Sequence, residues 1–283
     1  MTAQRPSPPT GPALVTGATS GLGRATALAL AARGWNILVH GRDKTRCDEV
    51  VAEIRAAGGS ASPYLADLSS LGRTAAMAEQ VASDYPSLSL LLNNAGVGFG
   101  ADTRYREVSK DGYELRLAVN YLAPVVLTKL LRAPLRAGGG QVVNVGSIGQ
   151  SPPDFDDLQF IRRYEGSKAY MRSKFALAAF TFAMAEEYLE DGIRVNCLHP
   201  GTYLDTGMTR EAGINPWSTV QEGVDAVLRV IEAGQNGTTG HFFDGSRPTR
   251  AHQDAYAPKV RQRLRALTGQ LLIGVEGAEK AVW

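Results

Sequence analysis

The sequence has little of several features that mark specialised classes of protein. Its 283 residues include only two cysteines, Cys47 and Cys197, and their wide separation argues against a disulfide framework. The longest largely apolar stretch, 175–185, is too short to span a bilayer and runs directly into Glu186 and Glu187. The first residues, MTAQRPSPPTGP, contain no apolar core of a signal peptide. These absences predict a soluble protein of the reducing cytoplasm.

An excess of charge of one sign is also missing. The 30 lysines and arginines are interleaved with 28 aspartates and glutamates, so no basic stripe marks a nucleic-acid or membrane partner. Asp154, Asp156 and Asp157 are clustered, but no histidine or cysteine accompanies them, and a solvated acidic loop is favoured over a metal site. Arginine outnumbers lysine by 23 to seven, which suggests a bacterial source and, with it, specialised metabolism.

Short apolar runs alternate with helical stretches along the chain. Strands are expected at 13–16, 36–40, 61–65, 88–93, 141–147, 192–201 and 239–243. Helices are expected at 22–34, 43–57, 69–84, within 109–135, from about 164 to 190, and at 217–234. Because the strands are apolar throughout, the pattern predicts an α/β domain with a Rossmann-type doubly wound parallel sheet of about seven strands and helices on both faces. This single domain spans 12–250, after a disordered lead at 1–11.

The stretch TGATSGLG (16–23) follows the first expected strand and opens the first expected helix. Gly17 allows a tight exit from the strand. Gly21 and Gly23 let the backbone approach a pyrophosphate, which the free N–H groups of a helix N-terminus attract. Glycines also serve ordinary β–α turns, but this position in the fold favours a nucleotide site.

The second expected strand ends in HGRD (40–43), which bears on the choice of nucleotide. A site for NAD usually has a carboxylate here that accepts a hydrogen bond from the ribose 2′-hydroxyl. Gly41 occupies that place and Arg42 follows, and a guanidinium can bind a 2′-phosphate through two hydrogen bonds. Asp43 comes too late and is suited to cap the next helix. A solvated surface arginine is the alternative, but the pattern favours NADP.

The motif Tyr-x-x-Ser-Lys occurs twice in RYEGSKAYMRSKF (163–175), as Tyr164 with Lys168 and as Tyr170 with Lys174. A lysine four residues after a tyrosine lies on the same helix face, where its charge favours the phenolate over the phenol. Six residues turn a helix by about 600°, so the two tyrosines cannot face one pocket on a continuous helix. An apolar stripe begins at Phe175, whereas the first pair lies among charged residues typical of a solvated turn. The second pair is therefore the candidate for chemistry.

These motifs, with NNAG (93–96) after the fourth expected strand, resemble the short-chain dehydrogenase/reductase family in its compact single-domain form. The resemblance covers about 12–245 and rests on the ordered set TGATSGLG, NNAG, the strand ending at Ser147, Tyr-x-x-Ser-Lys and GIRVNCLHPG. In the family, the lysine precedes the strand of the last motif by about the distance that separates Lys174 from Gly192. The segment 148–169 is similar to the insertion of the retinol-dehydrogenase-like branch and is expected to lie over the substrate.

The resemblance implies four catalytic residues. Tyr170 would exchange the proton and Ser147 would bind the carbonyl oxygen, while Lys174 would lower the pKa of the phenol and Asn120 would hold a water beside that lysine. The glycine turn, the Arg42 position and the resemblance together give the expected cofactor-binding residues, which are Gly17, Thr19, Ser20, Gly21, Leu22, Gly23, Arg42, Asp67, Leu68, Asn93, Ala95, Gly96, Tyr170, Lys174, Pro200, Gly201 and Thr206.

The expected function is an NADP(H)-dependent oxidoreductase that interconverts a ketone or aldehyde and an alcohol. Two alternatives remain open: other chemistry on the same fold (dehydration, epimerisation or cyclisation), and a cofactor-sensing binding protein that has lost catalysis.

A bulky apolar or aromatic substrate is suggested by the aromatic residues expected in loops near the pocket mouth. These residues are Phe99, Tyr105, Phe155, Phe160, Tyr203 and Trp217. The family usually pairs through its long fourth and fifth helices, which implies a homodimer or homotetramer. A C-terminal extension, 251–283, is expected to lie on or near the substrate side.

Overall fold

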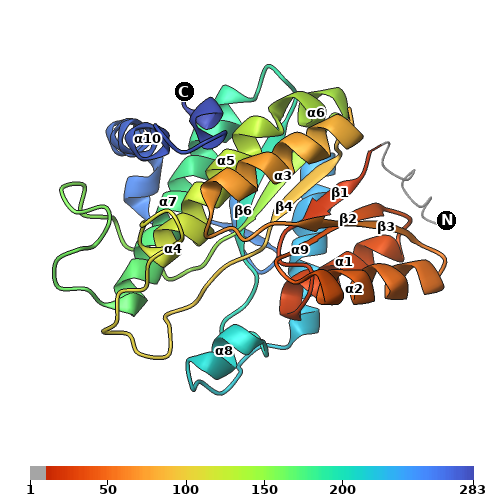
Figure 1. Ribbon diagram of the computed structural model, residues 1–283, viewed down its shortest axis with the longest axis horizontal. Coiled ribbons are helices and arrows are strands. Elements are labelled where there is room, and N and C mark those ends of the chain that lie inside the picture. Colours follow the sequence, from red (N-terminus) through yellow and green to blue (C-terminus); the bar gives the residue numbers. More distant parts are fainter. Residues whose placement is uncertain (1–10) are drawn as a thin grey trace.

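Eight strands form one sheet in the order β3-β2-β1-β4-β5-β6-β7-β8 in a computed structural model that describes residues 11–283 (Figure 1). The strands are β1 (Ala13–Val15), β2 (Asn36–Gly41), β3 (Ser60–Leu65), β4 (Leu90–Asn93), β5 (Gln141–Val145), β6 (Arg194–His199), β7 (Phe242–Asp244) and β8 (Arg247–Thr249). The first seven are parallel, as predicted, and β8 adds a short antiparallel edge strand that the sequence pattern did not indicate.

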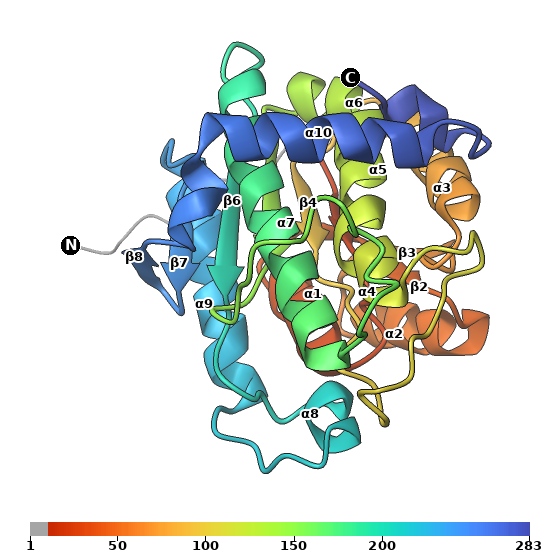
Figure 2. The same ribbon diagram turned by 90° about the vertical axis from the view of Figure 1, so that its left-hand side faces the viewer.

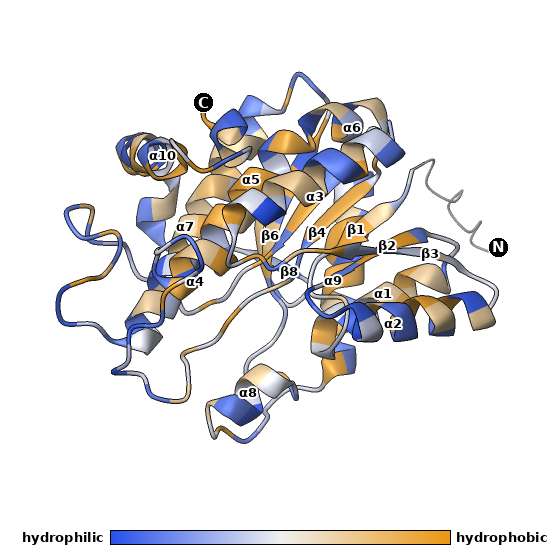
Figure 3. Ribbon diagram, in the orientation of Figure 1, coloured by the Kyte–Doolittle hydropathy of each residue, from blue (hydrophilic) through white to orange (hydrophobic). Residues whose placement is uncertain are grey.

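Two layers of helices cover the sheet (Figure 1). One layer, with its own apolar core, contains α1 (Gly21–Ala31), α2 (Lys44–Ala56) and α9 (Val220–Gln235). The other contains α3 (Leu71–Asp84), α4 (Leu115–Leu117), α5 (Ala123–Leu130), α6 (Arg132–Ala137) and α7 (Gly166–Glu187). The inner strands β1, β4, β5 and β6 are buried on both faces almost throughout, and β1 and β4 are strongly hydrophobic in Figure 3, whereas the edge strands β3 and β8 are partly or wholly exposed. The doubly wound fold is thereby confirmed.

The fourth long helix is not regular. Between α4 and α5 lies a π-helical turn, η1 (Ala118–Leu122), and Pro124 stands at the start of α5. Proline has no N–H to donate and is tolerated at the first turn of a helix, so a wider turn just before it relieves the conflict. Asn120 lies within this turn.

The start of α7 differs from the expectation that both tyrosine motifs share one helix. The helix begins at Gly166, after Glu165 in extended backbone, so Tyr164 lies outside it. Gly166 fits tightly, because a Cβ there would stand 2.2 Å from the carbonyl oxygen of Phe99. Its amide also donates to the carbonyl of Thr103. These contacts of the backbone, which no periodicity reveals, set the helix boundary.

The ends of the chain were predicted only in part. Most of the expected disordered lead falls on residues 1–10, which lie outside the described part of the chain, but Gly11 is buried and its amide donates to Oγ of Ser89 at 2.9 Å. Within 11–283, none of the helices has the length and apolar character needed to cross a membrane.

The C-terminal segment forms η2 (Gln253–Tyr256), α10 (Pro258–Leu272) and η3 (Ala278–Ala281). Figure 2 shows α10 crossing α7 at the end of the molecule opposite α8 (Gly207–Glu211). The Tyr256 ring stacks on Phe182, and the Tyr121 and Thr268 hydroxyls are hydrogen-bonded at 2.7 Å. The segment contacts the expected substrate side at two places: the His252 amide donates to Gln150, and Arg263 of α10 pairs with Asp156 of the segment 148–169. The rest covers the outer faces of α5 and α7.

Candidate active site

A cavity of about 800 Å³ opens at the carboxyl ends of the parallel strands, where ligands bind in doubly wound folds. One end is lined by the glycine turn after β1, and the other by Ser147, Tyr170 and Lys174. Its volume lies within the range of about 300–1,000 Å³ typical of small-molecule sites. The candidate nucleotide site and the candidate catalytic residues therefore share one cavity.

The glycine turn forms a cradle, a concave stretch of backbone that is open to the cavity only because its glycines carry no side chains. Gly17 and Gly21 have φ values of 64° and 49°, in the left-handed region that glycine adopts without strain. A Cβ on Gly23 would lie 2.2 Å from the carbonyl oxygen of Gly17. Ser20 precedes α1 but does not cap it with its side chain. The first amides of α1 thus face the cavity with the positive end of the helix dipole, as a pyrophosphate requires.

Asn94, for which no role was expected, joins the glycine turn to the loop after β4 by hydrogen bonds. Its backbone amide donates to Oγ1 of Thr16 at 2.9 Å, and its side-chain amide donates to the carbonyl of Thr16 at 2.8 Å. The expectation that Asn93 lines the cofactor wall is wrong. Asn93 is the last residue of β4 and its side chain points into the core, where it donates to Asn144 at 2.8 Å. Because side chains alternate along a strand, the wall position falls to the next residue.

His40 is a second missed residue. Its Nδ1 accepts a hydrogen bond from the Gly17 amide at 3.1 Å, and its Nε2 lies 3.2 Å from the carbonyl oxygen of Ala66. The two contacts fit a neutral ring that donates from Nε2, and they join the ends of β1, β2 and β3. Burial lowers the pKa of His40 to about 4, although the Ala66 carbonyl and Asp67 act in the opposite direction. A lone buried histidine gives no sequence signal of this role.

His40 makes the stability of the fold depend on pH. Between pH 6.5 and 4 the unfolded chain binds a proton at this ring that the folded chain does not, so the free energy of unfolding falls as the pH falls. A shift from 6.5 to about 4 corresponds to about 3 kcal/mol. We expect urea unfolding at pH 7, 5.5 and 4 to show this loss relative to His40→Gln, which keeps a donor and an acceptor but cannot titrate. Parallel pH profiles for the two proteins would refute this role of His40.

Gly41 and Arg42 stand where the second strand meets the cavity, and both line it. A Cβ on Gly41 would lie 2.6 Å from Cγ2 of Thr19 and 2.7 Å from Sγ of Cys47, so a side chain at the place of the usual carboxylate would require these two side chains to move. Arg42 is exposed, and its side chain forms no ion pair within residues 11–283. Asp43 caps α2 by accepting from the Arg46 amide at 3.2 Å, as predicted.

The remaining predicted cofactor residues surround the same cavity. Those that line it are Thr19, Ser20, Leu22, Asp67, Leu68, Ala95, Gly96, Pro200, Gly201 and Thr206. Burial opposes the ionisation of Asp67, but hydrogen bonds from Ser69 and Lys110 outweigh it and hold the pKa of this carboxyl below its usual range. The methyl group of Thr206 lies 3.1 Å from the position of a Cβ on Gly21, which places the loop before α8 over the glycine turn.

Ser147, Tyr170 and Lys174 converge at the other end of the cavity. Tyr170 and Ser147 line the cavity together, and the Ser147 hydroxyl is close enough to the phenol to lower its pKa. The Lys174 ammonium lies 5.6 Å from the centre of the Tyr170 ring and donates to the carbonyl of Val145 at 2.8 Å. The Phe99 ring meets the Tyr170 ring edge to face, with centres 5.0 Å apart. A hydroxyl, a phenol and a cation are thereby held around one point, as acid–base chemistry on a carbonyl group requires.

The pKa values of this group are governed by burial. Burial raises the pKa of Tyr170, and the neighbouring Ser147 hydroxyl offsets only part of that rise. Burial also lowers the pKa of Lys174 to about 8. The pKa of Tyr170 therefore lies above its ordinary value in these residues alone, and its predicted lowering by Lys174 stays a prediction for the site with its cofactor.

Asn120 lies behind this group. Its Oδ1 accepts from the Val97 amide at 2.8 Å, and its Nδ2 donates to the Val97 carbonyl and to Oγ of Ser173, each at 3.0 Å. A Cβ on Gly96 would be 3.2 Å from Oδ1 of Asn120 and 3.6 Å from Nζ of Lys174. The two residues are thus neighbours across Gly96, while Asn120 holds the loop after β4.

Tyr164 and Lys168 of the first tyrosine motif do not line the cavity, although Ser167 between them does. Lys168 is exposed and pairs with Glu165 at 2.6 Å. Tyr164, however, is not in the solvated turn that the flanking charges predicted, because it is half-buried against Glu114 and Arg116. The acidic residues of the same insertion are paired with arginine: Asp156 with Arg263 at 2.6 Å, and Asp154 and Asp157 with Arg162.

Comparison with known proteins places this site in a family. A sequence profile for short chain dehydrogenases matches residues 12–216. The chain is 32% identical to human retinol dehydrogenase 13, over 93% of this chain and 84% of the relative. It is 38% identical to mouse polyprenol dehydrogenase, over 71% of this chain and 62% of that relative. A metagenomic short-chain oxidoreductase in complex with NADP has a similar structure, with 27% identity, a TM-score of 0.66 and coverage of 86% of this chain and 99% of that one.

The fold, the arrangement of the cavity and these likenesses agree. In this family the doubly wound sheet binds a nicotinamide cofactor at the end where the cavity opens. The chain belongs to the short-chain dehydrogenase/reductase family of oxidoreductases, as its motifs predicted.

Proposed function

We propose that this protein is an NADP(H)-dependent oxidoreductase that interconverts a carbonyl group and an alcohol. The observation that carries the proposal is the convergence of Ser147, Tyr170 and Lys174 in one cavity with the glycine cradle. The alternative of a binding protein without catalysis is disfavoured because both the phenol and the ammonium of the site are present and line the cavity.

The residues present fit NADP better than NAD. The glycine cradle and the first turn of α1 would hold the pyrophosphate. Arg42 would bind the 2′-phosphate with two donors of its guanidinium, and Gly41 carries no carboxylate that would repel that phosphate. When bound, the cofactor would supply or accept the hydride.

The protein residues would manage the proton and the developing negative charge. Tyr170 would donate its phenolic proton to the carbonyl oxygen in reduction and take it back in oxidation. Ser147 would donate a hydrogen bond to the same oxygen and stabilise its negative charge. Lys174 would stabilise the phenolate that Tyr170 becomes, and Asn120, beside it across Gly96, would hold a water that returns the proton.

The substrate end of the cavity favours a bulky apolar ketone or alcohol. Its lining there is mainly apolar and includes Val97, Phe99, Leu115, Val119, Met171 and Met208. Of the loop aromatics expected at the pocket mouth, Phe99 and Tyr203 line the cavity, whereas Tyr105, Phe155, Phe160 and Trp217 do not. Relatives named for retinol and for polyprenol, both long apolar alcohols, agree with this class.

A homodimer or homotetramer remains our expectation, but we expect its interface to lie on a surface other than the helices through which the family usually pairs. The C-terminal segment covers the helices through which the family usually pairs: Trp283 lies against Phe180 of α7, and Lys129 of α5 lies over the Trp283 ring. Light scattering on the full chain measures the oligomeric state. If pairing does use α5 and α7, the chain should remain monomeric until residues 251–283 are displaced.

A panel of ketones and alcohols, assayed with NADPH or NADH by the absorbance of the reduced cofactor, tests the proposed function. We expect turnover with NADPH on bulky apolar ketones, and much less with NADH. Product formed without a change in NADPH absorbance would instead indicate dehydration, epimerisation or cyclisation. Cofactor binding without any product across the panel would indicate a binding protein.

A further inference from the structure

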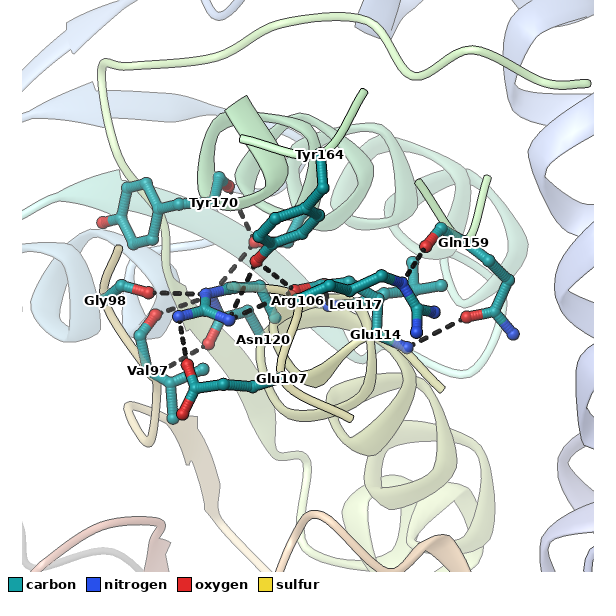
Figure 4. Close-up of polar contacts among 12 residues, drawn as sticks. Val97, Gly98, Arg106, Glu107, Glu114, Leu117, Asn120, Gln159, Tyr164 and Tyr170 are labelled. Carbon is teal, nitrogen blue, oxygen red and sulfur yellow. Dashed lines mark hydrogen bonds and ion pairs between the residues drawn. The ribbon is translucent and has the colours of Figure 1, made fainter. Parts of the chain in front are cut away.

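A buried arginine outside the cavity forms the centre of a polar cluster that the proposed mechanism does not use (Figure 4). Arg116 of α4 is 1% exposed. Its Nε donates to the carbonyl of Gly98 at 2.9 Å, its Nη2 donates to Glu107 at 2.6 Å, and its Nη1 donates to the Tyr164 hydroxyl at 3.0 Å and approaches Glu114 at 3.4 Å. We call Glu107, Glu114, Arg116 and Tyr164 the arginine cluster.

Glu114 and Tyr164 depend on the guanidinium and on each other. The Glu114 side chain is 3% exposed, so its charge is tolerated only beside the guanidinium. Its Oε2 caps α4 by accepting from the Leu117 amide at 2.7 Å, and its Oε1 accepts from the Tyr164 hydroxyl at 3.1 Å. Burial, followed by the charge of Glu114, raises the pKa of Tyr164. Tyr164 therefore stays protonated and donates, which suits a structural contact and not proton exchange.

The cluster reaches the active site through the loop after β4. Arg116 and Asn120 are four residues apart on neighbouring turns, and they hold successive residues of that loop: Arg116 binds the carbonyl of Gly98, and Asn120 binds both polar groups of Val97. Phe99 follows and packs against the ring of Tyr170. Residues 97–99 form a wall of the cavity. A shift of Arg116 would therefore move that wall.

The cluster also binds the insertion 148–169. Tyr164 is its direct contact, and Gln159 supports it, because its side chain accepts from the Glu114 amide at 2.9 Å and its carbonyl accepts from Arg106 at 3.1 Å. Close to Tyr164, Ser167 lines the cavity. The insertion and the 97–99 wall, which are distant in sequence, thus meet at one guanidinium.

We propose that Arg116 is a positioning residue which, through Tyr164 and Gly98, fixes the insertion against the 97–99 wall and so sets the width of the substrate end of the cavity. The first tyrosine motif then has a role of its own: Tyr164 holds the insertion in place, while Tyr170 does the chemistry. This inference rests on the proposed function for its kinetic consequence, but its structural content can be measured without turnover.

Tyr164→Phe is the informative variant, because it removes one hydroxyl and keeps the ring that packs against Phe160. We expect the KM for a bulky apolar ketone to rise about tenfold, the order expected for one hydrogen bond to a charged group, and the KM for a small ketone to change little. A variant that is merely less stable would instead lower the apparent kcat for both ketones equally and leave both KM values unchanged. That result, or no change, or any other pattern without the size-dependent rise in KM, overturns the proposal.

Amide hydrogen exchange provides the readout that does not depend on activity. We expect faster exchange in Tyr164→Phe at both 98–99 and 159–164, with the sheet unchanged, and a larger effect in Arg116→Lys, which keeps the charge beside Glu114 but loses the planar fork. Lys168→Ala, from the same motif but exposed, is the control and should match the wild type. Unchanged exchange in these segments refutes the proposal, whereas an absence of turnover in the wild type refutes the proposed function alone.

Discussion

Tyr170→Phe is expected to lower turnover by about 10³-fold, within the range of about 10²–10⁴ that a general acid contributes, while Tyr164→Phe keeps most of the kcat for a small ketone. The reason is geometric. The Tyr170 phenol lies in the cavity beside Ser147 and Lys174, whereas the Tyr164 phenol lies outside it and donates to Glu114. The comparison is matched because each variant removes one hydroxyl from one copy of the same motif.

The measurement is kcat with NADPH and a small ketone, accompanied by the melting temperature and the Kd for NADPH. Tyr170→Phe should bind NADPH and melt like the wild type, because its hydroxyl makes no contact that holds the fold together. Comparable losses of kcat in the two variants would contradict the assignment of the acid. A loss in Tyr170→Phe that came with loss of NADPH binding would assign Tyr170 to the cofactor instead.

The layered fold was largely predictable from the sequence, because its signals are local. Most strands are short apolar runs that alternate with helical stretches, so seven of the eight strands were found. The eighth, Arg247–Thr249, is three exposed residues long and has no apolar pattern to reveal it. Pro124 was the sole sequence feature that indicated the π-helical turn at Asn120, since a wider turn leaves the spacing of apolar residues almost unchanged.

The site was predictable where a motif fixes the backbone and less so where side chains act over long sequence distances. The turn at 16–23 and the pair Tyr170 and Lys174 lie where spacing placed them. His40 contacts residues 23 and 26 positions away, and Arg116 meets Tyr164 at a separation of 48, so no local pattern could indicate either contact. The charges flanking Tyr164 predicted solvent, but a guanidinium brought from α4 buries its ring instead.

Arg42→Ala is expected to weaken the binding of NADPH by about 10- to 100-fold, the loss expected for hydrogen bonds to a charged group, and to leave NADH within about twofold. Arg42 is exposed and lines the cavity at the end of β2, and its side chain forms no ion pair within 11–283 that would hold it elsewhere. Titration of the protein with each cofactor, followed by tryptophan or NADPH fluorescence, gives both dissociation constants. Arg46→Ala is the matched control, because it removes the same charge from a neighbouring exposed arginine that does not line the cavity.

Gly41→Asp separates the two parts of the argument for NADP. The new carboxylate should weaken the binding of NADPH by repelling the 2′-phosphate, yet it should not strengthen the binding of NADH, because its Cβ would have to displace the side chains of Thr19 and Cys47. A strong gain in NADH affinity would show that the side chains of Thr19 and Cys47 move readily, and that Gly41 does not determine the preference for NADPH over NADH. Equal affinities of the wild type for both cofactors would contradict the proposed NADP site.

Added salt should weaken the binding of NADPH more in the wild type than in Arg42→Ala, since screening acts on the contact between guanidinium and phosphate that only the wild type has.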